Sequence, residues 1–274
     1  MGDERVEIMD CVCSWYDLLG YGTPFVEAKW DLNDERCRIN IDRIENLKMQ
    51  FHSSWSVVPL GTRLAFNDGF ASTIDINTSS SEHFKNSLYF LEGAIKDFEV
   101  ISHYDIRKGF PGIRGIIACG QRFSYDSCSH SYDVLGEKTL AYFPLEFQMN
   151  TAFSKAFIIE ESGSRANIAG NNLYFDIEIY KFLKRASEEI GCRPPQIVEQ
   201  GNDFLVKIYD MKGWFADLCV ERNGIVFGPS TKYNNRGIET VLYKYKSLHS
   251  KIDEYAKEAA YQQALRYSKM EDYE

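Results

Sequence analysis

The segment WYDLLGYGTPF, residues 15–25, constrains the fold more than any other part of the chain. The aromatic and apolar residues before Asp17 favour a strand, so this acid stands at a strand end. Small and helix-capping residues follow it: Gly20, Gly22, Thr23 and Pro24. The glycines permit a tight turn, Thr23 suits the N-cap of a helix and Pro24 suits its first position. The segment therefore predicts a strand, a turn and a helix start, and free N–H groups at that start favour a polyphosphate.

A second acid, Asp68, stands in a similar apolar run, RLAFNDGFASTID, whose Asn67-Asp68-Gly69 sequence is typical of a hairpin turn. An ionised carboxylate is costly to bury unless a cation or hydrogen-bond donors meet it. Two such acids beside a phosphate-binding turn indicate a shared cation, because Mg²⁺ is held by one or two carboxylates together with substrate phosphates. Each acid alone has an ordinary alternative: Asp17 as a hydrogen-bonded strand end, and Asp68 as a turn residue.

The composition of the 274 residues is that of a folded, acidic protein. Hydrophobic residues make up 44% of it and the formal net charge is −9, which disfavours nonspecific nucleic-acid binding. The sequence has no apolar run of about 18 residues to span a membrane, and the acidic start MGDERVEIMD lacks the pattern of a secretory signal. Seven scattered cysteines without a C-x-x-C pair favour reduced thiols. We therefore expect a cytoplasmic protein that binds neither membranes nor nucleic acid.

Hydrophobic periodicity and turn residues predict alternating strands and helices. The expected elements are a strand at 5–19, a helical pattern at 23–54 that is interrupted near Asn33, a hairpin at 62–76, a helix at 82–100, strands at 113–123 and 141–150, and helices at 151–162 and 180–190. We predict a domain over residues 1–190 and a C-terminal extension over residues 191–274. The extension is expected to hold short antiparallel strands, FLVKIYD, WFADLCV and GIVFG, and a long helix from about 238 to 270.

Taken together, these features resemble the class III nucleotidyl cyclases over roughly residues 5–165. Residues 16–21 occupy the central places of that family's phenylalanine-any-Asp-Ile-any-Gly-Phe-Thr pattern, with Thr23 one position late. Residues 67–70 match its second acid turn, and Asp17 and Asp68 lie 51 residues apart, a separation that the family tolerates. The resemblance implies an α/β (α+β) fold with a central, mostly antiparallel sheet flanked by helices.

The same resemblance implies a site for two divalent ions, Mn²⁺ or Mg²⁺. Their expected ligands are Asp17, Asp68 and the carbonyl of Leu18. The turn after the first strand is expected to bind the nucleotide through Leu18, Gly20, Tyr21, Gly22 and Thr23. The ions would activate the ribose 3′-hydroxyl, orient the triphosphate and help pyrophosphate to leave.

The family also uses an Asn and, four residues on, an Arg, both supplied by the second protomer of a homodimer to stabilise the transition state. In EFQMNTAFSKA, Asn150 matches the Asn, with a helix cap as its alternative role. Ser154 stands where the Arg is expected and Lys155 follows it. Either Lys155 or Arg165 then supplies the charge, or the chain is a catalytically poor relative. Arg114 is expected to anchor its strand.

Two further positions bear on the nucleobase. The family's purine-reading Lys and Asp are replaced by Leu64 and Phe143, and FPLEFQMNTAFSKAFIIEESGSRANIAG resembles the pyrimidine cyclases of the bacterial Pycsar antiphage system. This resemblance implies conversion of UTP to cyclic 3′,5′-UMP and pyrophosphate, with CTP and cyclic CMP as the alternative. The product would act on a separate effector protein in antiphage defence. Alternatives of other kinds are a noncatalytic cyclase-like module that binds nucleotide and, more distantly, a palm-type nucleotidyltransferase.

Overall fold

The structure is a computed structural model that describes residues 7–53, 61–76, 80–124, 132–134, 137–139, 144–211 and 219–250. The chain forms two compact units. The first comprises Met1–Phe182 and Ser230–Lys244, and the second comprises Leu183–Pro229 and Tyr245–Glu274. The chain thus passes from the first unit to the second, returns to the first and then enters the second again, whereas the sequence suggested a single boundary after residue 190.

A β-sheet organises the first unit, with strands in the order β2-β3-β1-β4-β7-β11-β10. The strands are β1 (Glu7–Leu18), β2 (Thr62–Phe66), β3 (Gly69–Ile76), β4 (Ile113–Ser124), β7 (Leu173–Asp176), β10 (Cys219–Asn235) and β11 (Ile238–Ser250). β1 lies between β3 and β4 and pairs antiparallel with both, while β7 pairs parallel with β4. The mostly antiparallel sheet with flanking helices that the sequence predicted is confirmed.

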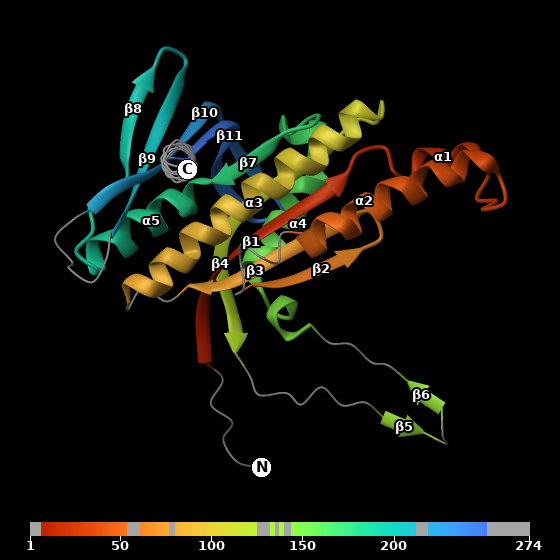
Figure 1. The fold of residues 1–274 in the computed structure, drawn as a ribbon, viewed down its shortest axis with the longest axis horizontal. Helices are drawn as coiled ribbons and strands as arrows, with labels where there is room; N and C mark the ends of the chain where they lie inside the picture. Colours follow the sequence, from red (N-terminus) through yellow and green to blue (C-terminus); the bar gives the residue numbers. More distant parts are fainter. Residues whose placement is uncertain are drawn as a thin grey trace, which may run out of the picture. The chain divides into compact units, whose positions relative to one another are not determined.

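Alternation along β1 sends its side chains to two faces, and each face is covered by a helix (Figure 1). α4 (Thr151–Ser162) packs on the face that carries Trp15, whose ring meets Phe153 and Phe157 edge-on. α3 (Ser81–Arg107) packs on the other face, where the Tyr16 hydroxyl donates to the Ala94 carbonyl at 2.7 Å. The helices predicted at 82–100 and 151–162 are therefore confirmed, the first extended to Arg107.

Small side chains bring the start of α4 close to the sheet. A Cβ added at Gly120 on β4 would lie 2.4 Å from the backbone nitrogen of Ala152, so only glycine fits there. Ala152 and Ala156 are fully buried beneath the helix. Cys11 and Cys13 belong to the same core cluster, and burial raises the pKa of Cys11 to about 12. These cysteines pack as small apolar residues.

The helical pattern predicted at 23–54 is interrupted, and the break includes Asn33, as the sequence indicated. The structure has α1 (Thr23–Glu27), a 3₁₀ turn η1 (Glu35–Arg38) and α2 (Ile39–Ser53). Lys29 and Trp30 have φ values of 52° and 65°, a left-handed conformation that a helix cannot continue through. A buried ion pair between Arg43 and Asp105, which are 2% and 1% exposed, then holds α2 against α3.

The strand predicted at 141–150 is wrong over the part that the structure describes. Leu145–Phe147 form a 3₁₀ turn, η3, which leads into the N-cap of α4, and residues 141–143 lie outside the described part. The Pro144 ring removes one backbone donor and favours such a turn. Two short strands precede it, β5 (Tyr132–Val134) and β6 (Glu137–Thr139), paired antiparallel. At its other end α4 leads into η4 (Gly163–Ala166).

The second unit holds an antiparallel ladder of β8 (Gln196–Gln200), β9 (Asp203–Met211) and the first part of β10. FLVKIYD lies in β9 as expected, whereas GIVFG and the last two residues of WFADLCV form one strand, β10, and not two. Residues 214–218 of WFADLCV lie outside the described part. α5 (Ile177–Glu189) matches the helix predicted at 180–190 and begins earlier, in the first unit.

The long helix predicted from 238 is wrong over residues 238–250, which form the strand β11. Arg236 and Gly237 have φ values of 50° and 78°, the conformation of a two-residue hairpin turn that links β10 to β11. The strand that follows is rich in β-branched and aromatic residues, among them Thr240, Val241 and Tyr243, and these outweigh the helical spacing. Residues 251–270 of the predicted helix lie outside the described part.

Candidate active site

The two predicted acids meet where β1 ends beside the β2–β3 hairpin. Asp17 pairs with Gly69 in the register of β1 and β3, and the Leu18 N–H donates to the Asp68 carbonyl at 2.9 Å. Asn67 and Asp68 form the two-residue hairpin loop, with Asn67 in the left-handed conformation at φ 55°. Sheet register thus brings together two carboxylates that are 51 residues apart in sequence.

Trp15 fixes the shape of this corner from the α4 face. A Cβ added at Gly69 would lie 2.1 Å from the Trp15 ring, so the indole occupies the space that any larger residue would need. The glycine of the Asn-Asp-Gly turn is therefore required by a close approach of the ring as well as by the turn.

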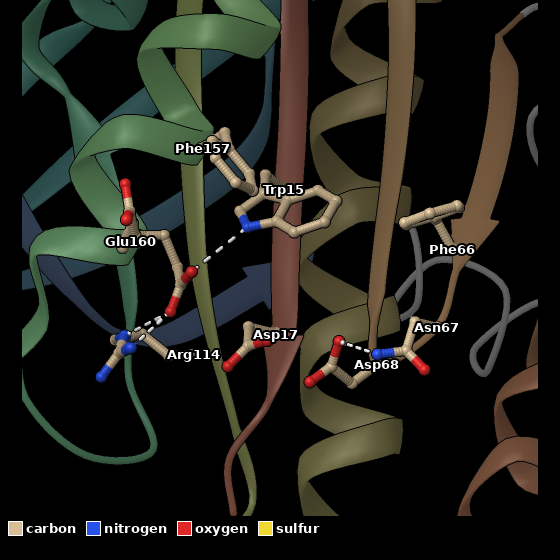
Figure 2. A pocket seen from close by; sticks show the side chains of 9 residues that line it. Trp15, Asp17, Phe66, Asn67, Asp68, Arg114, Phe157 and Glu160 are labelled. Carbon is tan, nitrogen blue, oxygen red and sulfur yellow. Dashed lines mark hydrogen bonds and ion pairs between the residues drawn. The ribbon is translucent and has the colours of Figure 1, made fainter. Parts of the chain in front are cut away.

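Asp17 and Asp68 line a cavity of about 410 Å³. Its walls are aromatic and charged, and are formed by Trp15, Asp17, Phe66, Asn67, Asp68, Arg114, Phe157, Glu160 and Glu161 (Figure 2). β1, the β2–β3 hairpin, β4 and the last turn of α4 each contribute to it. Four carboxylates and one guanidinium give the lining a formal charge of −3, which favours a cation.

Arg114 is bound to Glu160 at one side of the cavity (Figure 2). Its Nε donates to Glu160 Oε1 at 2.8 Å, a second guanidinium nitrogen donates to the same oxygen, and Trp15 Nε1 donates to Glu160 Oε2 at 3.3 Å. Arg114 lies on the central strand β4 and also lines the cavity. The sequence predicted only that it would anchor its strand.

Asp17 has a different environment. Within the described residues, the Asp17 carboxylate has no hydrogen bond and no ion pair. The Asp68 carboxylate accepts one hydrogen bond there, from Asn67 Nδ2 at 3.1 Å. Burial, followed by the charges of Glu160 and Asp68, raises the pKa of Asp17 to about 7, although the nearby Arg114 acts in the opposite direction. A cation placed beside Asp17 would therefore stabilise its ionised carboxylate.

The donor set suits a divalent ion that is completed by substrate. The described residues contain no cluster of three or more His, Cys, Asp or Glu side chains that could enclose a metal by themselves. Mg²⁺ and Mn²⁺ sites in nucleotide enzymes need only one or two carboxylates, with phosphates and water filling the remaining positions. The Leu18 carbonyl accepts one hydrogen bond, from Tyr21 N–H at 3.2 Å, and retains a second lone pair. Asp17, Asp68 and this carbonyl therefore fit the expected ions.

The turn after β1 is held by its own backbone. Tyr21 and Thr23 donate their N–H groups to the carbonyls of Leu18 and Gly20, and Asn40 Nδ2 donates to the Tyr21 carbonyl at 2.7 Å. Gly22, and not Thr23, is the N-cap of α1, which has five residues and is too short to act as an anion site by its dipole. Gly20, Tyr21, Gly22 and Thr23 do not line the cavity, so their contact with phosphate stays a prediction.

The residues predicted for the transition state lie outside this cavity and have partners within their own chain. Asn150 is the buried N-cap of α4: its Oδ1 accepts from Phe153 N–H at 2.8 Å, and its Nδ2 donates to Thr73 Oγ1 and the Glu146 carbonyl. The structure thus shows the capping role that the sequence offered as an alternative.

The neighbouring positions on α4 are also engaged. The Ser154 hydroxyl donates to the Asn150 carbonyl at 3.0 Å. Lys155 is ion-paired with Asp176, which is buried and also accepts from the Thr240 hydroxyl. A role for Asn150, Ser154 or Lys155 across a dimer therefore stays a prediction.

The two positions expected to face the base have separate outcomes. Leu64 on β2 is partly buried against the core cluster beneath α4 and presents no polar group. Phe143 lies outside the described residues.

Sequence reasoning missed Glu160, Glu161 and Trp15 as cavity residues and undervalued Arg114. Trp15 lies two residues before Asp17, so strand alternation places it on the same face as the acid, and this signal was available. No local pattern links Glu160 to Arg114, because they are 46 residues apart and meet only after α4 has packed.

No protein-family model matches the sequence, and no curated protein matches it significantly. Among solved structures, the adenylyl cyclase CyaB from P. aeruginosa is 11% identical and aligns over 89% of this chain and 96% of its own, with a TM-score of 0.46. The guanylyl cyclase domain of the RhoGC fusion protein from Blastocladiella emersonii is 9% identical over 90% of this chain and 99% of its own, with a TM-score of 0.41. At this level of similarity, the function has to be argued from the chain's own residues.

In the part that the structure describes, none of the helices combines the length and apolar character needed for a membrane span.

Proposed function

We propose that the chain is a metal-dependent nucleotide cyclase that converts UTP to cyclic 3′,5′-UMP and pyrophosphate, with CTP as the alternative substrate. The observation that carries this proposal is the pair Asp17 and Asp68, which share one cavity and lack a cationic partner among the described residues. A partly buried carboxylate pair without a counterion is unfavourable in a purely structural role.

The proposed reaction is an internal displacement. The ribose 3′-oxygen bonds to the α-phosphorus, the bond from that phosphorus to the pyrophosphate oxygen breaks, and the 3′-hydroxyl proton is released. Divalent ions bound by Asp17, Asp68 and the Leu18 carbonyl would favour the 3′-alkoxide and offset charge on the leaving pyrophosphate. Trp15 and Phe157 give one side of the cavity an aromatic wall.

We propose a homodimer with shared active sites, since the one guanidinium among the described residues that line the cavity is already paired with Glu160. Asn150, Ser154 and Lys155 would then act from the second copy, with Lys155 or Arg165 as the cation. Exposed apolar side chains just before and within α4 support a partner here: Met149 is 66% exposed and Phe157 is 41% exposed.

The proposed pyrimidine preference rests on the sequence resemblance, in which Leu64 and Phe143 stand at the positions where that family reads purines. The remaining parts of the proposal, a cytoplasmic enzyme whose product acts on an effector in antiphage defence, rest on the sequence resemblance to the Pycsar cyclases.

A product assay tests the proposal. The purified chain is incubated with each of the four nucleoside triphosphates and Mn²⁺, and products are resolved by mass spectrometry. We expect cyclic UMP, or cyclic CMP, and its loss in Asp17→Asn and Asp68→Asn variants that keep their fold. Absence of any cyclic product, together with nucleotide binding by calorimetry, would support the noncatalytic module instead. Linear or dinucleotide products would indicate a different nucleotidyltransferase.

A further inference from the structure

We propose that Glu160 is a positioning residue that holds the Arg114 guanidinium away from Asp17 and so keeps the Asp17 carboxylate open to a divalent cation. This inference rests on the proposed function in one respect: it takes Asp17 as a metal ligand. It adds a role for the last turn of α4, which the predicted metal ligands leave unexplained.

Strand register makes Arg114 the natural partner of Asp17. The two residues are directly opposite each other on β4 and β1, so their side chains leave the same face of the sheet. Oppositely charged side chains in this relation ordinarily attract each other. Arg114 instead bonds to Glu160 through Nε and a second guanidinium nitrogen, while Asp17 has no ion pair with any described residue.

Glu160 is built to hold that guanidinium. It is 6% exposed and lies in the last turn of α4, which ends at Gly163. Its second carboxylate oxygen accepts from Trp15 Nε1 at 3.3 Å, so both oxygens are engaged and the side chain has little freedom to turn. Arg114 is itself only 14% exposed, and a guanidinium at this depth stays with its carboxylate because separation would leave a buried charge unpaired.

The four carboxylates of the cavity therefore fall into two kinds. Glu160 is paired with Arg114, and Glu161 is paired with Arg236. Asp17 and Asp68 have no arginine or lysine partner among the described residues, although Arg114 lies across the strand from Asp17. Arginines of the chain thus neutralise Glu160 and Glu161, whereas Asp17 and Asp68 remain available to bind a cation.

Mn²⁺ binding to the full-length chain tests this role without turnover. Free Mn²⁺ is measured by electron paramagnetic resonance during titration, so that the readout is the dissociation constant of the ion alone. In Glu160→Gln, we expect Arg114 to turn to Asp17 and Mn²⁺ binding to weaken by about tenfold or more, the effect of a competing cation at close range. The double variant Glu160→Gln/Arg114→Gln removes the competing guanidinium, and its dissociation constant should return to within about threefold of the unmodified value.

Glu161→Gln is the matched control. It removes the same charge from the same cavity but leaves the pair of Glu160 and Arg114 intact, so Mn²⁺ binding should change by less than about threefold. Equal weakening by Glu160→Gln and Glu161→Gln would reduce the effect to cavity charge and overturn the positioning role. Failure of the double variant to recover would overturn it too, because Glu160 would then be a ligand itself.

Arg114→Gln keeps the test decisive if Glu160→Gln does not fold. Without the guanidinium, Asp17 has no competitor, so Mn²⁺ should bind at least as tightly as to the unmodified chain, and weaker binding would contradict the proposal. Absence of Asp17-dependent Mn²⁺ binding in the unmodified chain would also overturn it. A chain that binds Mn²⁺ through Asp17 yet forms no cyclic nucleotide would sink the proposed function while leaving the role of Glu160 standing.

Discussion

At the scale of single residues, the cavity departs from what a stable fold alone would select. Asp17 is half-buried beside two other carboxylates, and its pKa is raised to about 7 from a usual 3.8. The ionised form of such a carboxyl group lowers the stability of the folded state at neutral pH. Destabilising groups of this kind are common at sites of binding or catalysis.

Asp17→Asn should therefore stabilise the metal-free protein at high pH. The pKa of Asp17 is higher in the folded than in the unfolded state, so the folded state binds the proton more tightly. Ionised Asp17 therefore destabilises the folded state fully above about pH 7, and this destabilisation is absent below about pH 4. We expect the free energy of unfolding of Asp17→Asn to exceed that of the unmodified chain by ~2 kcal/mol at pH 8, after discounting for partial exposure, and the gap to close toward pH 4. Urea unfolding at both pH values, in the presence of a chelator, measures it. A variant less stable at pH 8 would mean that Asp17 has a partner there.

Gly69 gives a second prediction at this scale. In Gly69→Ala the new methyl group meets the Trp15 ring, so the hairpin or the indole must move, and we expect a loss of ~2 kcal/mol in unfolding free energy with loss of Mn²⁺ binding. Gly22→Ala is the control, because Gly22 has φ −73° and nothing lies within 4 Å of an added Cβ. It should change stability by only a few tenths of a kcal/mol. Similar losses in both variants would contradict the steric account.

At the scale of elements, α4 carries Glu160 to the cavity and Asn150 fixes where that helix begins. Asn150→Ala removes a cap and leaves the donors and acceptors of Phe153, Thr73 and Glu146 without their partner. We expect a loss of ~2 kcal/mol or more in unfolding free energy. Ser154→Ala, on the exposed side of the same helix, should cost less than ~0.5 kcal/mol. Thermal unfolding of both variants compares them, and an Asn150→Ala variant as stable as Ser154→Ala would remove the capping role and favour catalysis.

The sequence predicted the elements whose signals are local. β1, the β2–β3 hairpin, α3, β4 and α4 follow from apolar periodicity, Gly and Pro placement and caps such as Ser80, which accepts from His83 N–H. The meeting of Asp17 and Asp68 was also predictable, since each is an isolated acid in an apolar strand.

The misses have physical causes. Residues 238–250 show a helical stripe, yet the turn at Arg236 and Gly237 and pairing with β7 select a strand. The pairs of Arg114 with Glu160 and of Arg43 with Asp105 join residues 46 and 62 positions apart, and no local pattern records such contacts. Tertiary packing decides them.

At the scale of the whole molecule, shared active sites predict complementation between inactive variants. Asp17→Asn lacks a proposed metal ligand and Lys155→Met lacks the proposed transition-state cation. If each site takes one residue from each copy, a mixed dimer contains one intact site, and remixing equal amounts should restore about a quarter of the unmodified activity. The rate of cyclic nucleotide formation after co-refolding measures it. No recovery would place both residues in the same copy, and full activity of Lys155→Met alone would transfer the charge to Arg165.

Trp15 has one more consequence. Its indole N–H is bonded to Glu160 inside the cavity, and the chain contains three other tryptophans, of which Trp30 is 72% exposed. Replacing those three by phenylalanine would leave Trp15 as the single tryptophan, and its emission would report on the carboxylate that holds Arg114. The protein thus contains its own optical probe, through which occupancy of the cavity can be followed in real time without a label.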